Sequence, residues 1–394
     1  MYPNLYYAFK DLFGVEWKFL RFVNSFGFFV AIAFIICAIV LANELRRKSK
    51  QGLFQPTEMQ VMVGQPATIV DLGLNFLLGF VLGYKIVALF IMDSTATEDP
   101  QAFIFSTLGS WPAGILLGLL FAGLKWWEKN KQKLAKPEKR TVRIWPHDRV
   151  GEITIMALIF GLLGAKLFDI FENWSGFLKD PSAYIFSAQG LTFYGGLICA
   201  AIAIWLYAKK HNIGFWHLND AMAPTMMLAY SLGRIGCQVS GDGDWGIPNT
   251  SPKPFNWLPD WMWAYRYPHN VNEVGEKIPG CTDVKYCNQL DVAVFPTAFY
   301  EIVVCFILFL ILWSLRKKLK VPGMLFGLYL MLNGLERFFI EKIRVNTRLD
   351  IFGFRPTQAE VISTILFLSG LAIWIIRAQK AKKQKLTGGA VNPS

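Results

Sequence analysis

Charged residues are scarce in this sequence, and that scarcity excludes an ordinary soluble protein. Of its 394 residues only 17% are charged, whereas 54% are hydrophobic and 15% are aromatic. The mean hydropathy is +0.35, and a soluble chain would carry about 25% charged residues. The first 22 residues also lack the basic start, compact apolar core and small-residue cleavage site of a cleavable signal peptide. The composition therefore predicts an all-α polytopic integral membrane protein.

Long apolar runs supply the expected membrane spans. A helix needs about 20 apolar residues to cross the hydrocarbon core, and nine segments approach this length. The third and sixth are the weakest, because the pair Trp111–Pro112 and the segment 220–224 interrupt them. The nine expected spans are residues 22–42, 69–92, 106–126, 151–173, 190–208, 217–237, 295–315, 321–342 and 356–377.

Positive charge gathers at one side of these spans. Five basic clusters, which follow spans one, three, five, seven and nine, hold 23 of the 40 Lys and Arg residues, whereas loops such as DSTATEDP are neutral or acidic. The positive-inside rule then places the N-terminus outside and the C-terminus in the cytoplasm. Because the clusters are short and lie at helix ends, the net charge of +12 indicates topology and no nucleic-acid partner.

Cysteine and histidine are rare, with six and four residues. No Cys/His set has the spacing of metal ligands, so we expect no metal and no other cofactor. Cys281 and Cys287 lie in the segment 238–294, which the topology places outside, where disulfides form. Because CTDVKYC closes a short ring, we expect a Cys281–Cys287 disulfide in preference to a metal site.

A repeat is visible when the chain is shifted by 81 residues. LLGFVLGYKIVALF (77–90) then aligns with LIFGLLGAKLFDIF (158–171) without a gap. Chance matching of apolar segments is the alternative, but Lys85 meets Lys166, and Phe-Ser and Gly positions further along also match. The repeat favours a duplicated helix hairpin, of which only the second copy contains a Tyr-Gly-Gly sequence.

The run SLGRIGCQVSGDGDWG (231–246) places Arg234 near the end of the sixth span. An arginine at hydrocarbon depth costs about 2.5–3.5 kcal/mol on insertion scales and is usually kept for a function. Gly233 and Gly236 on either side of it let a ligand or another backbone come close. We therefore expect Arg234 to belong to a binding site.

This run resembles the signature of the prolipoprotein diacylglyceryl transferase family, Gly-Arg-(Ile/Leu)-Gly-Asn-Phe-x-Asn-Gly-Glu-x-Trp-Gly. FYGGLI (193–198) and NGLERFFIEKIR (333–344) resemble two further family motifs in the same order, and FGFFVAIAF (26–34) resembles the first family helix. The resemblance covers residues 22–42 and 151–380, and the intervening segment is additional to the usual seven spans.

The chain divides into six regions on this basis. They are an N-terminal segment with the first span (1–42), an additional hairpin with basic cytoplasmic loops (43–150), core helices with the Tyr-Gly-Gly and Gly-Arg-Ile-Gly motifs (151–237), an external cap (238–294), the last three spans with the second arginine (295–380) and a basic disordered tail (381–394). The aromatic sequence WLPDWMWAYRYP is expected to hold the cap on the membrane surface.

The resemblance implies an enzyme of lipoprotein maturation in the bacterial cytoplasmic membrane. Its substrates would be phosphatidylglycerol and the lipobox cysteine of a prolipoprotein signal peptide, and glycerol phosphate would be released near the outer leaflet. Arg234 and Arg337 would bind phosphate, and Tyr194 would orient a substrate. The other substrate-binding positions that the motifs imply are Phe26, Gly195, Gly196, Gly236, Asp242, Asn333 and Glu341.

Several motif positions depart from the family pattern. Tyr194 replaces the motif histidine, Cys237 and a following serine replace two asparagines, and Asn333 replaces a tyrosine. Asp242 or Asp244 replaces the motif glutamate, with one residue inserted. The histidine role is therefore not carried over. Two cations near a substrate thiol, which ionises with a pKa of about 8.5, would make a dedicated base unnecessary.

The expected topology gathers the motif residues at one depth. Arg234 and Arg337 lie in the last turns of outward-running spans, and Tyr194 lies in the first turns of an inward-running span. Snorkelling of each arginine to the interface is the alternative. Glu341, one turn after Arg337, is expected to fix its guanidinium by an i,i+4 pair, with an idle surface pair as the alternative.

Two other functional classes stay open at this stage. A transporter or flippase for an anionic lipid would use the same arginines without making a bond, and an internal repeat is common among transporters. A non-catalytic membrane scaffold would need neither the arginine pair nor the Gly-Gly sequence.

Overall fold

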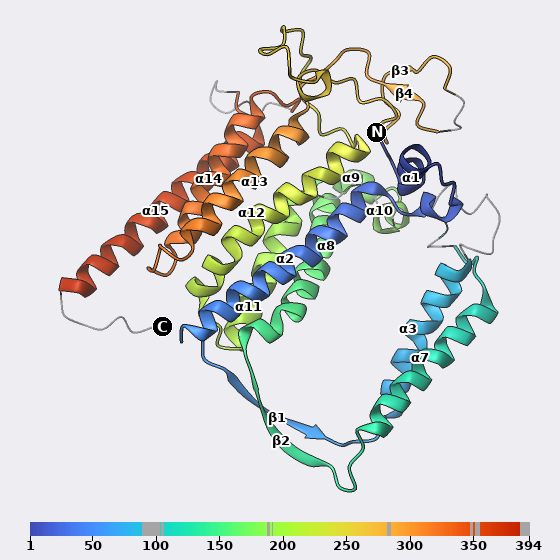
Figure 1. Cartoon of the computed structure of the whole chain (residues 1–394), viewed down its shortest axis with the longest axis vertical. Helices are drawn as coiled ribbons and strands as arrows, with labels where there is room; N and C mark the ends of the chain where they lie inside the picture. Colours follow the sequence, from blue (N-terminus) through green and yellow to red (C-terminus); the bar gives the residue numbers. More distant parts are fainter. Residues whose placement is uncertain are drawn as a thin grey trace.

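The computed structural model describes residues 1–88, 103, 106–186, 190, 192–281, 285–346, 350 and 355–386, most of them helical (Figure 1). Nine helices in this part of the chain are long, and each overlaps one expected span. They are α2 (Ser25–Lys50), α3 (Ile69–Leu82), α7 (Trp111–Lys131), α8 (Val150–Glu172), α11 (Phe193–Lys210), α12 (Phe215–Ser240), α13 (Thr297–Leu315), α14 (Met324–Glu341) and α15 (Gln358–Leu386). The shorter helices are α1 (Leu5–Phe13), α9 (Trp174–Phe177), α10 (Pro181–Phe186), a π-helical turn (Gly83–Val87) and the 3-10 turns Lys18–Phe22, Pro146–Arg149 and Asp260–Met262.

Five segments of the described chain are long and apolar enough to cross a membrane, as expected of a helical membrane protein. They are Ser25–Lys50, Ile69–Val87, Pro146–Glu172, Thr297–Leu315 and Gln358–Lys383. Residues 89–92 of the second expected span and residue 191 of the fifth lie outside the described residues. Helix α12 is continuous although Pro224 lies inside it. A proline removes one backbone hydrogen bond, and packing of α12 against α2 and α13 compensates for that loss.

Two small sheets correct the all-α prediction. β1 (Thr57–Val63) pairs antiparallel with β2 (Glu138–Ile144), and this ribbon connects the main bundle to the α3–α7 hairpin (Figure 1). β3 (Glu276–Lys277) pairs with β4 (Asn288–Gln289) in the cap. Apolar residues alternate with polar ones along TEMQV in β1. This period of two indicates a strand, and a search for apolar spans overlooks it.

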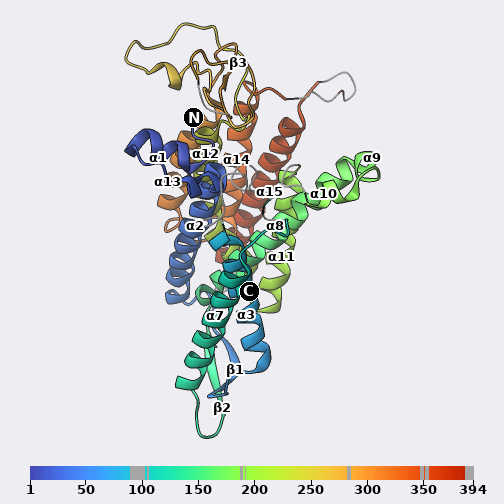
Figure 2. The same cartoon turned by 90° about the vertical axis from the view of Figure 1, so that its right-hand side faces the viewer.

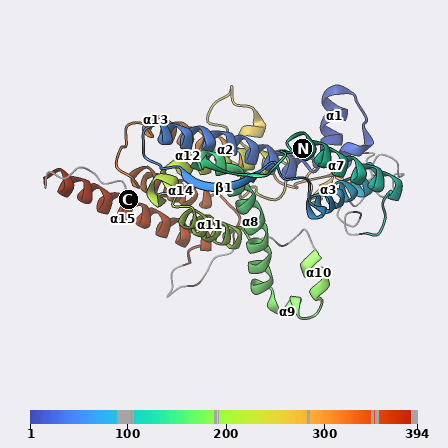
Figure 3. The same ribbon diagram turned by 90° about the horizontal axis from the view of Figure 1, so that it is seen from below.

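The expected repeat appears as two helix hairpins, α3–α7 and α8–α11. A side chain at Gly83 would collide with the carbonyl of Ala113 and crowd Cα of Gly114, and one at Gly164 would collide with the carbonyl of Gly195. These glycines match each other under the 81-residue shift, so both hairpins close through the same pair of small residues. Helices α3 and α7 pack mainly on each other. Their hairpin and α15 lie on opposite sides of the molecule (Figures 1 and 3).

The cap, residues 241–281 and 285–294, lies over one end of the bundle (Figure 2). The buried hydroxyl of Tyr267 donates a hydrogen bond to Gln238 of α12 at 3.0 Å, which ties the cap to that helix. Cys281 and Cys287 form a disulfide, so this prediction is confirmed. Trp257 remains exposed on the cap surface, as the expected contact with a membrane surface requires.

The basic tail begins later than expected. Helix α15 continues to Leu386, six residues into the segment predicted to be disordered. Lysines and glutamines favour the helix once α14 supports its earlier turns, because their side chains lose little freedom in a helix. Residues 387–394 lie outside the described residues.

Lys85 offers a test that the additional hairpin has a structural role. Its ammonium donates hydrogen bonds to the carbonyls of Phe103, Ser106 and Leu108 at 2.8, 2.6 and 2.9 Å. Lys85→Met would remove these bonds, so hydrogen–deuterium exchange should become faster in the segment that begins at Ser106. Lys125→Met, which removes only a surface ion pair, is the control. Equal exchange in the two variants would contradict the structural role.

Candidate active site

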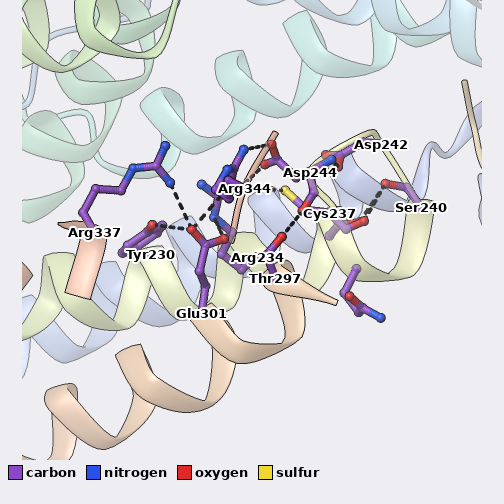
Figure 4. Close-up of polar contacts among 12 residues, drawn as sticks. Tyr230, Arg234, Cys237, Ser240, Asp242, Asp244, Thr297, Glu301, Arg337 and Arg344 are labelled. Carbon is purple, nitrogen blue, oxygen red and sulfur yellow. Dashed lines mark hydrogen bonds and ion pairs between the residues drawn. The ribbon is translucent and has the colours of Figure 1, made fainter. Parts of the chain in front are cut away.

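Glu301 is the centre of an ion-pair cluster near the cap (Figure 4). Its Oε1 accepts hydrogen bonds from the Tyr230 hydroxyl at 2.9 Å and from Nη1 of Arg337 at 3.1 Å. Its Oε2 lies 2.9 Å from Nε of Arg234, and Nη1 of Arg344 lies 3.5 Å from Oε1. The Glu301 side chain has 0% exposed surface. One buried carboxylate thus contacts three guanidiniums and a phenol.

Three neighbouring helices supply most of these groups. Tyr230 and Arg234 are four residues apart on α12 and therefore share one helix face. The guanidinium carbon of Arg234 lies 5.2 Å from the centre of the Tyr230 ring, within the range of a cation–π contact. Glu301 lies near the start of α13, and Arg337 lies in the last turns of α14. Both helices pack against α12, so the polar ends of all three converge.

Asp244 is the second carboxylate that the arginines share. Its two oxygens pair with Arg234 and Arg344. Gly241 ends α12 in the left-handed conformation, with φ of 63°, and turns the chain back toward the cluster. The Thr297 hydroxyl donates a hydrogen bond to the carbonyl of Asp244 at 2.6 Å. Burial acts to raise the pKa of Asp244, but Arg234 and Arg344 outweigh burial and hold this pKa below its ordinary value.

Arg344 follows α14 and is positioned by the chain that leads into the cap. The Ile247 amide donates a hydrogen bond to the carbonyl of Ile343 at 2.8 Å, and Arg344 forms a β-bridge with Gly246. Among the described residues, Nε and Nη1 of Arg344 have no hydrogen-bond partner, although Nη1 is within ion-pair range of Glu301. Two buried donors of Arg344 are thus left without a hydrogen bond.

The structure brings together the two arginines predicted from the sequence, since Arg234 and Arg337 meet at Glu301. The predicted pair between Arg337 and Glu341 is confirmed, with Nη2 at 3.2 Å from Oε2. Glu341 is buried and also accepts a hydrogen bond from Asn346 at 2.6 Å. The alternative of an idle surface pair is therefore wrong.

Three other predicted residues adjoin this cluster. A Cβ atom at Gly236 would lie 3.1 Å from Cα of Phe26, so α2 and α12 cross closely beside Arg234. Asn333 is half-buried on α14, one turn before Arg337. Binding of substrate by Phe26, Gly236 and Asn333 stays a prediction, which their positions suit.

Tyr194, Gly195 and Gly196 lie on α11, which packs along α8. Gly195 and Gly196 are buried, and side chains there would meet Phe168 and the backbone of Gly161. The close approach that these glycines permit is therefore between two helices. No contact in the described part of the chain joins Tyr194 to the arginines, and its role stays a prediction.

Cys237 and Asp242 lie beside the cluster. The Cys237 sulfur and carboxylate oxygens of Asp242 and Asp244 lie within 4.8 Å of one another, a group that the sequence analysis did not expect. Both oxygens of Asp244 already pair with guanidiniums, so we assign no metal to this group. Burial and the charge of Asp244 raise the pKa of Asp242.

Sequence reasoning missed Glu301, Tyr230 and Arg344. Glu301 is the single charged residue of the otherwise apolar span 295–315, and a carboxylate inside a span is itself a sign of function. Tyr230 precedes Arg234 by one helical turn. Arg344 belongs to the third motif but lies beyond the expected end of its span. A search for charged residues inside the spans therefore did not identify it.

Residues 113–376 match the family model of prolipoprotein diacylglyceryl transferase. The chain is similar to proteins named phosphatidylglycerol–prolipoprotein diacylglyceryl transferase. It is 30% identical over 289 residues to that of Dehalococcoides mccartyi strain CBDB1, covering 72% of this chain and 96% of the relative. It is 28% identical over 260 residues to that of Chlorobaculum tepidum, covering 62% and 80%. It is 29% identical over 294 residues to that of Pasteurella multocida, covering 73% and 95%.

Glu336 gives a matched test of the electrostatics around Glu301. It is 8% exposed on α14, and neither of its carboxylate oxygens has a hydrogen-bond partner among the described residues. Glu301→Gln should lower thermal stability strongly, because breaking a buried ion pair costs about 3–5 kcal/mol. Glu336→Gln replaces a buried carboxyl group that has no hydrogen-bond partner with an amide of the same shape, so it should leave stability unchanged or raise it. Thermal unfolding of both variants in detergent checks this, and equal losses would count against the cluster as a source of stability.

Proposed function

The chain belongs to the prolipoprotein diacylglyceryl transferase family, and we propose that it transfers the diacylglyceryl group of phosphatidylglycerol to the lipobox cysteine of prolipoproteins. The observation that carries this proposal is the convergence of Arg234, Arg337 and Arg344 on one buried carboxylate. The reaction would be the lipid-attachment step of lipoprotein maturation in the bacterial cytoplasmic membrane.

The arginines suit the leaving group of this reaction. The cysteine sulfur attacks a glyceryl carbon of the lipid, a carbon–sulfur bond forms, and the carbon–oxygen bond to phosphate breaks. Glycerol phosphate departs with the bonding electrons, so negative charge grows on the phosphate. Planar guanidiniums stabilise this charge by paired hydrogen bonds in a site with little water.

The carboxylates would hold the arginines ready while the site is empty. Each guanidinium has five N–H donors, and the ion pairs to Glu301, Asp244 and Glu341 use only some of them. A phosphate would bind the remaining donors, including those of Arg344 that have no partner among the described residues. Glu301 and Asp244 then serve as positioning residues that fix the orientation of each guanidinium group.

Proton removal from the substrate thiol follows from the same charges. Cations near a thiol lower its pKa from about 8.5 and increase the thiolate fraction. Tyr194 then acts as a hydrogen-bond donor that orients a substrate, since a phenol is neutral near pH 7. Asp242, Asn333 and Phe26 would line the path by which the substrates reach the arginines.

The long helices and the distribution of charge together support the proposed membrane topology. The nine long helices would span the membrane, with the N-terminus and cap outside and the C-terminus in the cytoplasm. The arginine cluster includes Asp244 of the cap (Figure 4), so the reaction would take place near the outer leaflet. The basic clusters, at the ends of α2, α7, α11, α13 and α15, would face the cytoplasm.

One assay separates the transferase from a transporter or flippase for an anionic lipid. Purified protein is mixed with phosphatidylglycerol and a lipobox peptide, and released glycerol phosphate is measured. A transporter would move the lipid without releasing this product. The helix hairpins that repeat in this chain run in the same direction, whereas transporters commonly contain inverted repeats. Absence of release under all conditions would remove the enzyme proposal.

Arg234→Ala should reduce transfer by about 10²–10³-fold or more, as expected when a donor to a developing oxyanion is removed. Arg234→Lys should recover little activity, because a lysine ammonium cannot form the two parallel hydrogen bonds that a planar guanidinium forms with phosphate. Glycerol phosphate release gives the rate, and thermal unfolding shows whether each variant is folded. Full activity in a folded Lys variant would refute the bidentate role.

Tyr194→Phe tests how the thiol loses its proton. Loss of a general base would reduce the rate by about 10²–10⁴-fold. We expect a smaller loss, mainly in substrate binding, and substantial recovery as the pH rises from about 6 to 9, because more thiol then ionises unaided. The pH–rate profile is the measurement. A large loss that stays flat across this range would make Tyr194 the proton acceptor.

A further inference from the structure

A second group of basic residues surrounds a cavity at the opposite end of the bundle from Glu301. The cavity has a volume of about 420 Å³ and is lined by Arg47, Lys48, Arg316, Lys317 and Lys320. Glu301 lies near the start of α13 and Arg316 follows its end. At 1.5 Å per residue, roughly 22 Å of helix separates this cavity from the arginine cluster. The two sites are therefore distinct.

The inner cations of the cavity are fixed by the protein. Glu44 is buried, and its carboxylate lies 2.9 Å from Nε of Arg47 and 3.1 Å from Nε of Arg316. The Lys48 ammonium is buried and donates a hydrogen bond to the carbonyl of His217 at 3.0 Å. The guanidinium of Arg316 also lies over the Trp313 ring, 3.5 Å from its centre. These contacts hold three positive charges around one space before any ligand binds.

The cavity keeps an excess of positive charge. Glu44 and Asp220 are the carboxylates beside it, against five cations. The oxygens of Asp220 accept hydrogen bonds from the amides of Gly323 at 2.8 Å and Phe326 at 2.9 Å, where they cap the start of α14. Lys317 and Lys320 are exposed at the rim. Within the part of the chain that the structure describes, no carboxylate pairs with either lysine.

Two simpler roles explain only some of these residues. Cations at the ends of α2 and α13 complement the carbonyl ends of those helices, and cytoplasmic loops are generally basic. Either role is fulfilled by lysines that point into solvent, such as Lys318. Neither requires a buried lysine or an arginine bound to a buried glutamate of another helix.

We propose that this cavity binds the phosphate of an anionic phospholipid headgroup from the leaflet at this end of the bundle. Basic pockets between transmembrane helices on the cytoplasmic side recognise anionic headgroups. The volume falls in the range of about 300–1,000 Å³ that small-molecule sites have. The fixed arginines supply directed hydrogen bonds, and the rim lysines supply attraction at the membrane surface. The bound lipid joins the ends of α2, α12 and α13.

The experiment measures lipid binding to the purified full-length protein by native mass spectrometry. The probe is phosphatidic acid, with phosphatidylcholine and inorganic phosphate as the comparison ligands. The test variant is Lys317→Gln with Lys320→Gln, at the rim. The matched control is Lys318→Gln with Lys380→Gln, which removes the same charge from exposed lysines that do not line the cavity. All are repeated in an Arg234→Ala background, so that lipid at the proposed catalytic site is counted separately.

The rim variant should bind phosphatidic acid about 25-fold more weakly, because each of its two lysines contributes a factor of about five. The control pair should bind as the unmodified protein does, and phosphatidylcholine should bind weakly to all. Equal weakening in the rim and control variants would overturn the site. Binding of inorganic phosphate as tight as that of the lipid would overturn its assignment to a lipid headgroup.

Discussion

The ion pairing of the buried Glu301 with three arginines is the interaction on which the cap end of the bundle depends. An isolated ion in a low-dielectric interior costs several kcal/mol, and neither the carboxylate nor any of the guanidiniums would be tolerated alone at this depth. Together they connect α12, α13 and the end of α14. The charges that we propose for the chemistry thus also hold these helices together.

The two ends of the bundle use charge differently. Near the cap, Asp244, Glu301 and Glu341 balance Arg234, Arg337 and Arg344, so the proposed anion would share donors that are already oriented. At the other end, cations outnumber carboxylates around an open cavity. A network of balanced charges favours an anion of one shape in one orientation. A network with excess positive charge favours the attraction of anions in general. The difference suits a reaction centre at one end and a resting contact with lipid at the other.

The sequence predicted the features that depend on the length of apolar segments and on the spacing of residues along the chain. All nine helices, the duplicated hairpin and the disulfide follow from apolar length, an 81-residue register and cysteine spacing. Arg234 was identifiable because arginine is rare in a span, and Arg337 because NGLERFFIEKIR (333–344) resembles a family motif. Glu301 was not, because its importance lies in which side chains three helices bring to it, and no single helix shows that. The Gly195–Gly196 pair shows a second limit, since a glycine permits close approach but does not say to what.

The duplicated hairpin has a consequence for how such a protein can grow. A membrane chain that gains one helix leaves everything after it facing the wrong way. A chain that gains two returns to the side from which it started. Because α3 and α7 form a complete pair, closed by their own glycines and attached through a ribbon at one end, their insertion preserves the direction of every later helix. If both helices cross the membrane, the added pair leaves the orientation of the proposed reaction site unchanged.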